Sequence, residues 1–350
     1  MTLPLITLTG HAQKEAWQLK VLPPVERIGE EIWSIPVPFP NNPMRYTLSY
    51  LLLGDGDAVL IDPGWDSETG MEHLAKGMRQ AGIGPTDLTG IVATHFHSDH
   101  LGMASRLRKS TGAWVALGEK EVRRLTAAEN LDLVLRDDRE QLAFWGVPAD
   151  RLAETALDRP SLTHLQNLAD PDLRLSQDSL VPAKGLNLRV VTTPGHSPGH
   201  ICLVDEPHAM IFSGDHVLPR ISPHIALELP GPVNPLADYY ESLDLIAFED
   251  EMEVCPAHEY RFIGMQRRVA QLIAHNRERS AEVLQVMEAH GPETVWDIAL
   301  RLTWSRGWES LRDFSLRLAL SETASHVVYL RSQGHTIDVP VTDPSWAAIT

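Results

Sequence analysis

The sequence predicts an α/β fold followed by a mainly helical C-terminal domain. Short apolar stretches of strand length alternate with helix-like stretches up to about residue 262, which is typical of α/β proteins. Beyond that point long helical patterns take over, and the length of 350 residues also fits two domains. We therefore expect a first domain over residues 1–262, with a helical insertion at about 119–170, and a second domain over residues 263–350.

The first domain opens with strands. A Gly-Asp-Gly-Asp turn at residues 54–57 separates two apolar, β-rich stretches. Ser67 is suited to be the N-cap of the helix that follows them. The elements predicted in this half are strands within 32–61 (Tyr46–Leu53 and Ala58–Ile61 among them), a helix over Ser67–Gln80, a strand over Gly90–Thr94, a helix over about 101–110 and a strand over Trp114–Leu117.

Residues 119–170 interrupt the strand pattern, because they favour helix and contain no clear strand. They hold an apolar group made of Leu131, Leu133, Val134, Leu142, Phe144 and Trp145. Two interpretations remain open: a lid over the site, or a helix pair with a small core of its own. After the insertion we expect strands over Leu173–Leu175, Leu186–Thr192, Ile201–Asp205, Ala209–Ser213 and Met252–Cys255, and a helix over Pro235–Phe248.

The C-terminal part shows helical patterns over 264–290, 294–304 and 308–333 and a short β-like tail over Thr336–Val341. Three helices and a small ribbon suggest a winged-helix-like domain, which invites a DNA-binding interpretation. Charge argues against it, since residues 265–350 contain 9 Arg, no Lys and 10 acidic residues, a balance of 9 − 10 = −1. We instead expect this domain to pack against the first one or to form a homodimer.

Composition narrows the classes of function. With 43% hydrophobic and 22% charged residues the chain is globular, and its net charge of −17 disfavours nucleic acid as the main partner. Cys202 and Cys255 are too few for a disulfide scaffold, and both are predicted to be buried strand residues. No apolar stretch is long enough to span a membrane and no secretory signal is visible, so we expect a cytoplasmic protein.

The clearest motif is His95-x-His97-x-Asp99-His100. Residues i and i+2 of a strand share a face, so His95 and His97 can reach one metal ion, while Asp99 and His100 can turn toward a second. Three more candidates follow the ends of apolar strands: His196, Asp215 and His258. Five His and two Asp suit two metal ions that share one carboxylate.

These motifs resemble those of the metallo-β-lactamase-fold superfamily, and within it the glyoxalase II-like hydrolases. The matching segments are Thr94–Gly102, Thr193–His200, Gly214-Asp215 and His258, with Asp62 in the position of an aspartate that supports the metal loop. The resemblance implies an αββα sandwich. It also implies that His95, His97 and His196 hold one metal, that Asp99, His100 and His258 hold the other, and that Asp215 bridges them. His200 closes the second motif, and a supporting or structural role suits it better than metal ligation.

The tail is similar to the winged-helix-like C-terminal domain of many bacterial relatives. Thr294–Asp297 and Leu318–Thr323 carry that similarity. Glyoxalase II enzymes instead end in a helical domain whose basic residues hold glutathione, and this chain has no matching basic cluster. Glu259 and Tyr260 after His258 do resemble their HEY segment.

Substrate contacts are suggested only by position after strand ends. The candidates are His216, Arg220, His224 and Tyr240, with Tyr239 beside the last of them. A packing or surface role competes with substrate contact at each position.

The sequence thus predicts a metal-dependent hydrolase with two Zn²⁺ ions, although Fe or Mn would suit the same ligands. Such ions supply hydroxide at neutral pH, and Asp99 is placed to orient it or to pass a proton. A thiolate leaving group needs no strong acid, so we expect a small-molecule thioester (hydroxyacylglutathione-like or acyl-CoA-like), with a lactone as the next choice. Other hypotheses are a mononuclear-iron persulfide dioxygenase using two His and Asp215, a nuclease, and a non-catalytic binding module.

Overall fold

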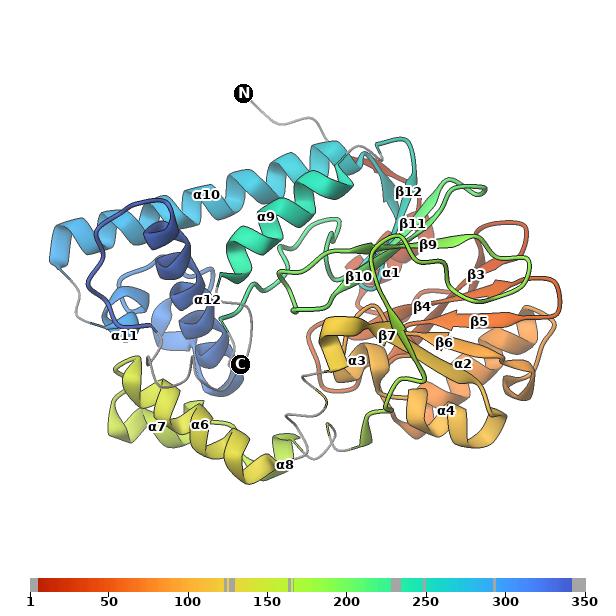
Figure 1. Ribbon diagram of the computed structural model, residues 1–350, viewed down its shortest axis with the longest axis horizontal. Helices are drawn as coiled ribbons and strands as arrows, with labels where there is room; N and C mark the ends of the chain where they lie inside the picture. The colour runs from red at the N-terminus through yellow and green to blue at the C-terminus, as the bar shows by residue number, and fades with distance from the viewer. Residues whose placement is uncertain are drawn as a thin grey trace.

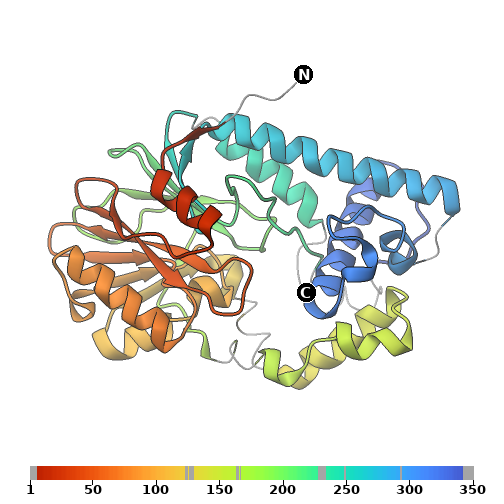
Figure 2. The ribbon, with the colours of Figure 1, turned by 180° about the vertical axis from the view of Figure 1, so that it is seen from behind.

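The computed structural model describes residues 6–122, 125, 130–162, 165, 167–227, 234–247, 250–291 and 294–341. Two β-sheets lie face to face with helices on their outer faces, and further helices form a separate group at one end (Figure 1; Figure 2 shows the reverse side). The fold is therefore an αββα sandwich with additional C-terminal helices.

The larger sheet has seven strands in the order β2-β3-β4-β5-β6-β7-β8. Strands β2 to β5 pair antiparallel, whereas β5 to β8 pair parallel. Its strands are β2 (Glu26–Arg27), β3 (Ile32–Pro38), β4 (Tyr46–Leu53), β5 (Ala58–Ile61), β6 (Gly90–Val92), β7 (Trp114–Gly118) and β8 (Leu173–Leu175). The predicted strands of the first half are confirmed, with ends that differ by at most two residues.

The smaller sheet has six strands in the order β1-β13-β12-β11-β10-β9. Strand β11 pairs parallel with β12 and antiparallel with β10, which in turn pairs antiparallel with β9. Strands β9, β11 and β12 therefore end at the same edge. The strands are β1 (Thr7–Leu8), β9 (Leu188–Thr192), β10 (Ile201–Asp205), β11 (Met210–Gly214), β12 (Glu253–Pro256) and β13 (Phe262–Ile263).

The two sheets bury an apolar core between them. Tyr50 of β4 and Phe212 of β11 meet across it with ring centroids 5.1 Å apart. Leu52, Val59 and Leu203 belong to the same cluster, and all are almost fully buried. Burying such a side chain stabilises the fold by about 2 kcal/mol, so the core holds the two sheets in register.

Helices cover both outer faces of the sandwich. Leu74 and Met78 of α2 (Glu68–Gln80) pack on the larger sheet beside α4 (Ala104–Thr111), and the Ser67 hydroxyl accepts from Gly70 N–H at 2.9 Å as the predicted N-cap. On the smaller sheet, α9 (Pro235–Ile246) and the first half of α10 (Met265–His290) bury a second apolar cluster. The short helix α3 (Ser98–Leu101) lies in the metal-motif loop, and α1 (His11–Leu19) was not predicted.

The described residues of the insertion pack against C-terminal helices rather than forming a core of their own. Its helices are α6 (Leu131–Phe144), α7 (Ala149–Thr155) and α8 (Arg159–Leu162). Leu142 and Trp145 join one apolar cluster with residues of α10, α11 (Val295–Ala299) and α12 (Asp313–Ser332). We call α6, α7, α11, α12 and the second half of α10 the helical body; Figure 1 shows α10 running from the sandwich into it. The helix-pair interpretation was wrong because the partner of this apolar face lies about 150 residues further along the chain.

The end of the chain differs from the sequence prediction. The predicted β-like tail Thr336–Val341 is not a strand. These residues have no regular secondary structure and run along the helical body. Val341 is buried there, and its carbonyl accepts from the Trp145 indole N–H at 2.9 Å. The helix predicted over 294–304 is the shorter α11.

Two smaller predictions are also settled. Cys202 and Cys255 are free and buried on strands β10 and β12, as predicted. Within the described residues no helix combines the length and the apolar character that a membrane span requires.

Candidate metal centre

The predicted ligands come from four loops at one edge of the sandwich. The segment after β6 carries His95 to His100, whereas the segments after β9, β11 and β12 carry His196, Asp215 and His258. Because these strands end at the same side of their sheets, residues far apart in sequence meet at the carboxyl ends of the strands.

The first cluster contains three histidines. His95 Nε2 lies 2.8 Å from His97 Nδ1, and His196 Nε2 lies 3.2 Å from the same atom. The three nitrogen atoms all lie within 4.8 Å of one another. Three ring nitrogens that converge in this way can bind one transition metal ion and leave a further coordination position open.

The second cluster contains Asp99, His100 and His258, again with ligand atoms within 4.8 Å of one another. His258 Nε2 lies 3.4 Å from Asp99 Oδ2 and 3.4 Å from Asp215 Oδ1. The other oxygen of Asp215 lies 3.8 Å from His196 Nε2. The same Oδ2 lies 3.7 Å from His100 Nε2, and Asp215 forms a third possible ligand group with His95 and His100. Asp215 therefore stands between the two clusters and faces residues of both.

The residues present fit a pair of metal ions. His100 Nε2 and Asp215 Oδ1 are buried, and neither has a hydrogen-bond partner among the described residues. Buried acceptor atoms without partners are costly, and a cation between them would remove that cost. The buried His and Asp clusters are thus consistent with a dinuclear metal site.

Three ring nitrogens are oriented by acceptors behind them. Nδ1–H of His100 donates to Asp62 Oδ2 at 2.9 Å, Nδ1–H of His258 to the Tyr46 carbonyl at 2.9 Å, and Nδ1–H of His196 to the His224 carbonyl at 2.8 Å. A ring that donates from Nδ1 keeps its Nε2 lone pair free. Each Nε2 therefore points into the site ready to bind a cation.

Asp62 forms hydrogen bonds to two residues of the segment that carries His95 to His100. Besides holding His100, it accepts from the Thr94 backbone N–H at 2.7 Å and from the Thr94 hydroxyl at 2.9 Å. It is buried, and its φ of 49° lies in the left-handed region that non-glycine residues seldom adopt. The backbone strain at Asp62 is offset by these bonds, which lock the start of the motif.

His200 lies directly behind Asp215. Its Nε2 accepts from the Asp215 backbone N–H at 3.2 Å, and its Nδ1 pairs with the Thr193 hydroxyl at 2.8 Å. Both ring nitrogens are therefore engaged away from the clusters. Gly214 makes this approach possible, because a Cβ at Gly214 would lie 2.7 Å from His200 Nε2 and its φ is 50°.

Glu121 is a supporting residue that the sequence analysis missed. It is fully buried, and its carboxylate accepts from Phe96 N–H at 3.1 Å and from the Ser197 hydroxyl at 2.7 Å. It thereby joins the loop of His95 and His97 to the loop of His196. Only its position just after β7 could have singled it out, and a lone glutamate there is a weak signal.

Burial favours the neutral form of two rings in the first cluster, His95 and His196. Loss of solvent lowers the pKa of His95 well below its ordinary value, and the surrounding histidines lower it further. Burial also lowers the pKa of His196, although Asp215 partly opposes it. Neutral imidazoles are the form that binds metals, so the environment favours ligation without proton release at these two rings.

The second cluster is ionised. Burial raises the pKa of Asp99, but His100 and His258 outweigh it and bring the pKa to about 2. The pKa of Asp215 is also held well below its usual range, since His258 and His100 outweigh its burial. The same carboxylates, together with Asp62, raise the pKa of His100 against the opposing effect of burial. Two carboxylates whose ionised form is favoured give the centre negative charge, which attracts divalent cations.

The predicted substrate contacts lie in varied surroundings. His216 is fully buried between His200 and Tyr239, which leaves no surface for the contact suggested from the sequence. Tyr240 packs against Tyr329 of α12 with ring centroids 5.1 Å apart. These rings therefore serve packing in this structure.

Arg220 and His224 are also engaged within the protein. Arg220 pairs with the fully buried Glu259 at 2.8 Å, while its own side chain stays 58% exposed. His224 donates from Nε2 to the Leu318 carbonyl of α12 at 2.9 Å. Arg220 is thus the member of the four whose side chain is largely open to solvent.

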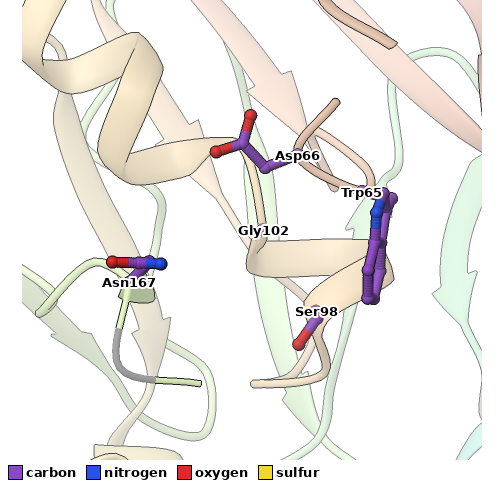
Figure 3. A pocket seen from close by; sticks show the side chains of 5 residues that line it. All are labelled: Trp65, Asp66, Ser98, Gly102 and Asn167. Carbon is purple, nitrogen blue, oxygen red and sulfur yellow. The ribbon is translucent and has the colours of Figure 1, made fainter. Parts of the chain in front are cut away.

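A small cavity borders the metal loop. Its volume is about 120 Å³, and it is lined by Trp65, Asp66, Ser98, Gly102 and Asn167 (Figure 3). Ser98 lies between His97 and Asp99 in the sequence, yet its side chain lines this cavity. The lining contains none of the seven candidate ligands, so the cavity is distinct from the two clusters.

Known proteins share this fold and parts of this sequence. The family model of the metallo-beta-lactamase superfamily matches residues 43–258, which contain all seven candidate ligands. The chain belongs to the metallo-beta-lactamase superfamily. The structure of a metallo-beta-lactamase family protein from Thermus thermophilus is similar with a TM-score of 0.75 and 25% identity, covering 88% of this chain and 95% of that one.

Curated relatives are more distant in sequence. "Probable metallo-hydrolase YqjP" of Bacillus subtilis is 26% identical and spans 87% of this chain and 93% of its own length. "Acyl-coenzyme A thioesterase MBLAC2" of Gallus gallus is 27% identical over 75% of this chain and 88% of its own length. "Hydroxyacylglutathione hydrolase" of Albidiferax ferrireducens is 26% identical over 60% of each chain. With the buried His and Asp clusters, these relatives support a metallo-hydrolase.

Proposed function

We propose that this protein is a dinuclear metallo-hydrolase that cleaves a small-molecule thioester. The observation that carries the proposal is the position of Asp215, whose carboxylate lies between the two clusters of buried ligands and within 3.8 Å of His196, His100 and His258. Such an arrangement would suit two cations rather than one. The acyl-coenzyme A thioesterase and the hydroxyacylglutathione hydrolase among the relatives favour the same substrate class.

The ligand set suggests zinc. His95, His97 and His196 would hold one ion, Asp99, His100 and His258 the other, and Asp215 both. Nitrogen-rich sets of this kind suit Zn²⁺, with Fe and Mn as chemically acceptable substitutes. Bound zinc supplies a hydroxide nucleophile near neutral pH and polarises a carbonyl group.

The remaining residues favour a leaving group that needs no proton. In the described part of the centre, Asp99 and Asp215 are the carboxylates among the candidate ligands. Asp62 is bonded to His100 and Thr94, and Glu121 to Phe96 and Ser197. The Thr47 hydroxyl donates to the backbone carbonyl of Asp99 at 2.8 Å and fixes the backbone there. The Asp99 side chain can then orient the nucleophile or move its proton. A thiolate leaves unaided, whereas the alkoxide of a lactone needs a donor, and thioesters are therefore favoured.

The competing hypotheses use less of what the site contains. A mononuclear-iron persulfide dioxygenase needs one set of two His and Asp215, which leaves Asp99, His100 and His258 without a role. A nuclease needs a basic surface, and the chain carries a net charge of −17. For the C-terminal part, we propose a winged-helix-like arrangement of its helices alone. The role we propose for these helices is packing rather than nucleic-acid binding.

The deciding experiment is metal content followed by a substrate panel. Protein purified without added metal is analysed by elemental mass spectrometry, and we expect close to two zinc ions per chain. Acyl-CoA thioesters, a hydroxyacyl glutathione thioester and lactones are then compared by kcat/KM, with the thioesters hydrolysed fastest. One iron per chain together with oxygen uptake on a persulfide would overturn the proposal, and faster lactone cleavage would overturn the substrate class.

A further inference from the structure

One metal-site histidine is linked to the helical body. Nδ1–H of His196 donates to the backbone carbonyl of His224 at 2.8 Å. The imidazole of the same His224 donates from Nε2 to the Leu318 carbonyl of α12 at 2.9 Å. A chain of two hydrogen bonds therefore runs from a candidate ligand, through one residue, to a helix that starts about 120 residues later in the sequence.

The segment that carries His224 is docked on α12 at a second point. Leu227 N–H donates to the Ser321 carbonyl at 3.2 Å, one turn from the carbonyl that His224 contacts. Leu227 is buried in the apolar cluster of the helical body, and Ile225 is buried in the cluster beneath α9 and α10. The residues between metal centre and helix thus have little freedom to move alone.

We propose that His224 is a positioning residue of the metal centre, through which α12 sets the orientation of the His196 ring. The acceptor behind a metal-bound imidazole fixes its tautomer and direction, and here that acceptor is a carbonyl whose place depends on the His224 side chain. The helical body thereby becomes part of the first metal site. The inference rests on the metal centre of the proposed function and is independent of the substrate.

Metal affinity tests this without an activity measurement. Zn²⁺ is titrated into metal-free protein against a chromogenic chelator, for the unmodified chain and for His224→Asn and His224→Gln. The glutamine amide can reach Leu318 as Nε2 does, whereas the asparagine amide is one methylene too short. We expect His224→Asn to weaken one of the two Zn²⁺ sites about tenfold and His224→Gln to restore most of that loss.

A matched control removes a different bond to α12. Ser332 accepts from the Asn234 side chain at 3.0 Å, so Ser332→Ala loses a contact between α12 and the segment before α9 without touching His196. Its Zn²⁺ affinities should equal those of the unmodified chain. The absorption spectrum of Co²⁺-loaded protein gives a second readout, because the His224→Asn change should alter the bands of one ion only.

The outcomes separate this inference from the proposed function. Fewer than two Zn²⁺ sites in the unmodified chain would contradict the dinuclear centre itself. Two sites with equal affinities in His224→Asn and the unmodified chain would contradict the role of His224 alone. If the variants do not fold, the ¹⁵N spectrum of the histidine rings in the unmodified, zinc-loaded protein decides: His224 must be protonated at Nε2, and a ring without that proton overturns the inference.

Discussion

Asp215 is the residue on which both halves of the candidate centre depend. Its side chain is 14% exposed, and its oxygens lie 3.4 Å from His258 Nε2 and 3.8 Å from His196 Nε2. Its backbone N–H donates to His200 Nε2. The position of Asp215 is therefore fixed by a backbone hydrogen bond as well as by the contacts of its carboxylate. A single substitution at Asp215 therefore reports on both metal ions.

Replacing Asp215 with Asn should lower metal binding and activity together. The amide offers one neutral oxygen where the carboxylate offers two charged ones, so Zn²⁺ affinity should fall by more than about a hundredfold. Elemental analysis and hydrolysis of the best thioester check this, with Asp205→Asn on β10 as a control outside the centre. Full metal content with full activity would contradict the bridging assignment.

Helix α12 is the element that joins three parts of the molecule. It packs against α7, α9, α10 and α11, and its Arg317 forms an ion pair with Asp138 of α6. Asp138 is almost completely buried and also accepts from Leu157 N–H at 2.8 Å. The insertion is therefore anchored by a buried charge as well as by apolar contacts.

Arg317→Met should loosen the joint between α6 and α12. It leaves the buried Asp138 carboxylate without its cation, which costs about 3 kcal/mol of unfolding free energy. Urea denaturation measures the loss. The double variant with Asp138→Asn should recover part of it, since the uncompensated charge is then gone; an equal loss in both would show that lost packing, not charge, is responsible.

His326 makes the joint between α12 and α10 sensitive to acid. Its Nδ1 lies 2.8 Å from the Ser280 hydroxyl, and burial, with Arg279 and His275 adding to it, lowers its pKa from 6.5 to about 3. At a pH between about 3 and 6.5, His326 binds a proton in the unfolded chain but not in the folded protein. The free energy of unfolding must then fall as pH drops below about 6.5, with a slope of up to about 1.4 kcal/mol per pH unit, and level off near pH 3.

His326→Gln tests that slope. Glutamine does not titrate, so metal-free His326→Gln should lose less stability than the metal-free unmodified chain between about pH 7 and pH 5. Urea denaturation at several pH values provides the comparison. Parallel pH profiles for the two proteins would mean that His326 is protonated as readily in the folded state as in the unfolded chain.

At the scale of the whole molecule, the candidate ligands tie the two sheets together. His95 to His100 follow a strand of the larger sheet, while His196, Asp215 and His258 follow strands of the smaller one. A metal ion bound by both sets binds only the folded arrangement. Its binding energy is therefore added to folding stability.

Removing the metals should lower the melting temperature. Free Zn²⁺ at a hundred times its dissociation constant stabilises a folded protein by about 2.7 kcal/mol per site. Thermal denaturation before and after dialysis against a chelator measures the shift, which re-addition of Zn²⁺ should reverse. Asp215→Asn should show a smaller shift; an unchanged melting temperature in the unmodified chain would contradict a link between the centre and folding.

The sequence by itself determined most of the strands, the motifs and the candidate ligand set, although β1, β2 and β13 were not predicted. Strands such as Tyr46–Leu53 and Ile201–Asp205 appear in the structure with the predicted ends, because a buried strand is encoded in a short run of neighbouring residues. The His95–His100 motif is similarly local, and His196, Asp215 and His258 each follow such a strand. These are features that a few adjacent residues can specify.

Only the tertiary structure decided what the other residues contact. Trp145 reaches Val341 across 196 positions, Glu121 joins two loops 25 and 76 positions away, and His224 meets α12 at a distance of 94 positions. Sequence periodicity does not identify such partners. An apolar helix face or a buried carboxylate must have a contact partner, but the local sequence does not specify which residue it is. The choice is made when the sandwich and the helical body pack together and bury them.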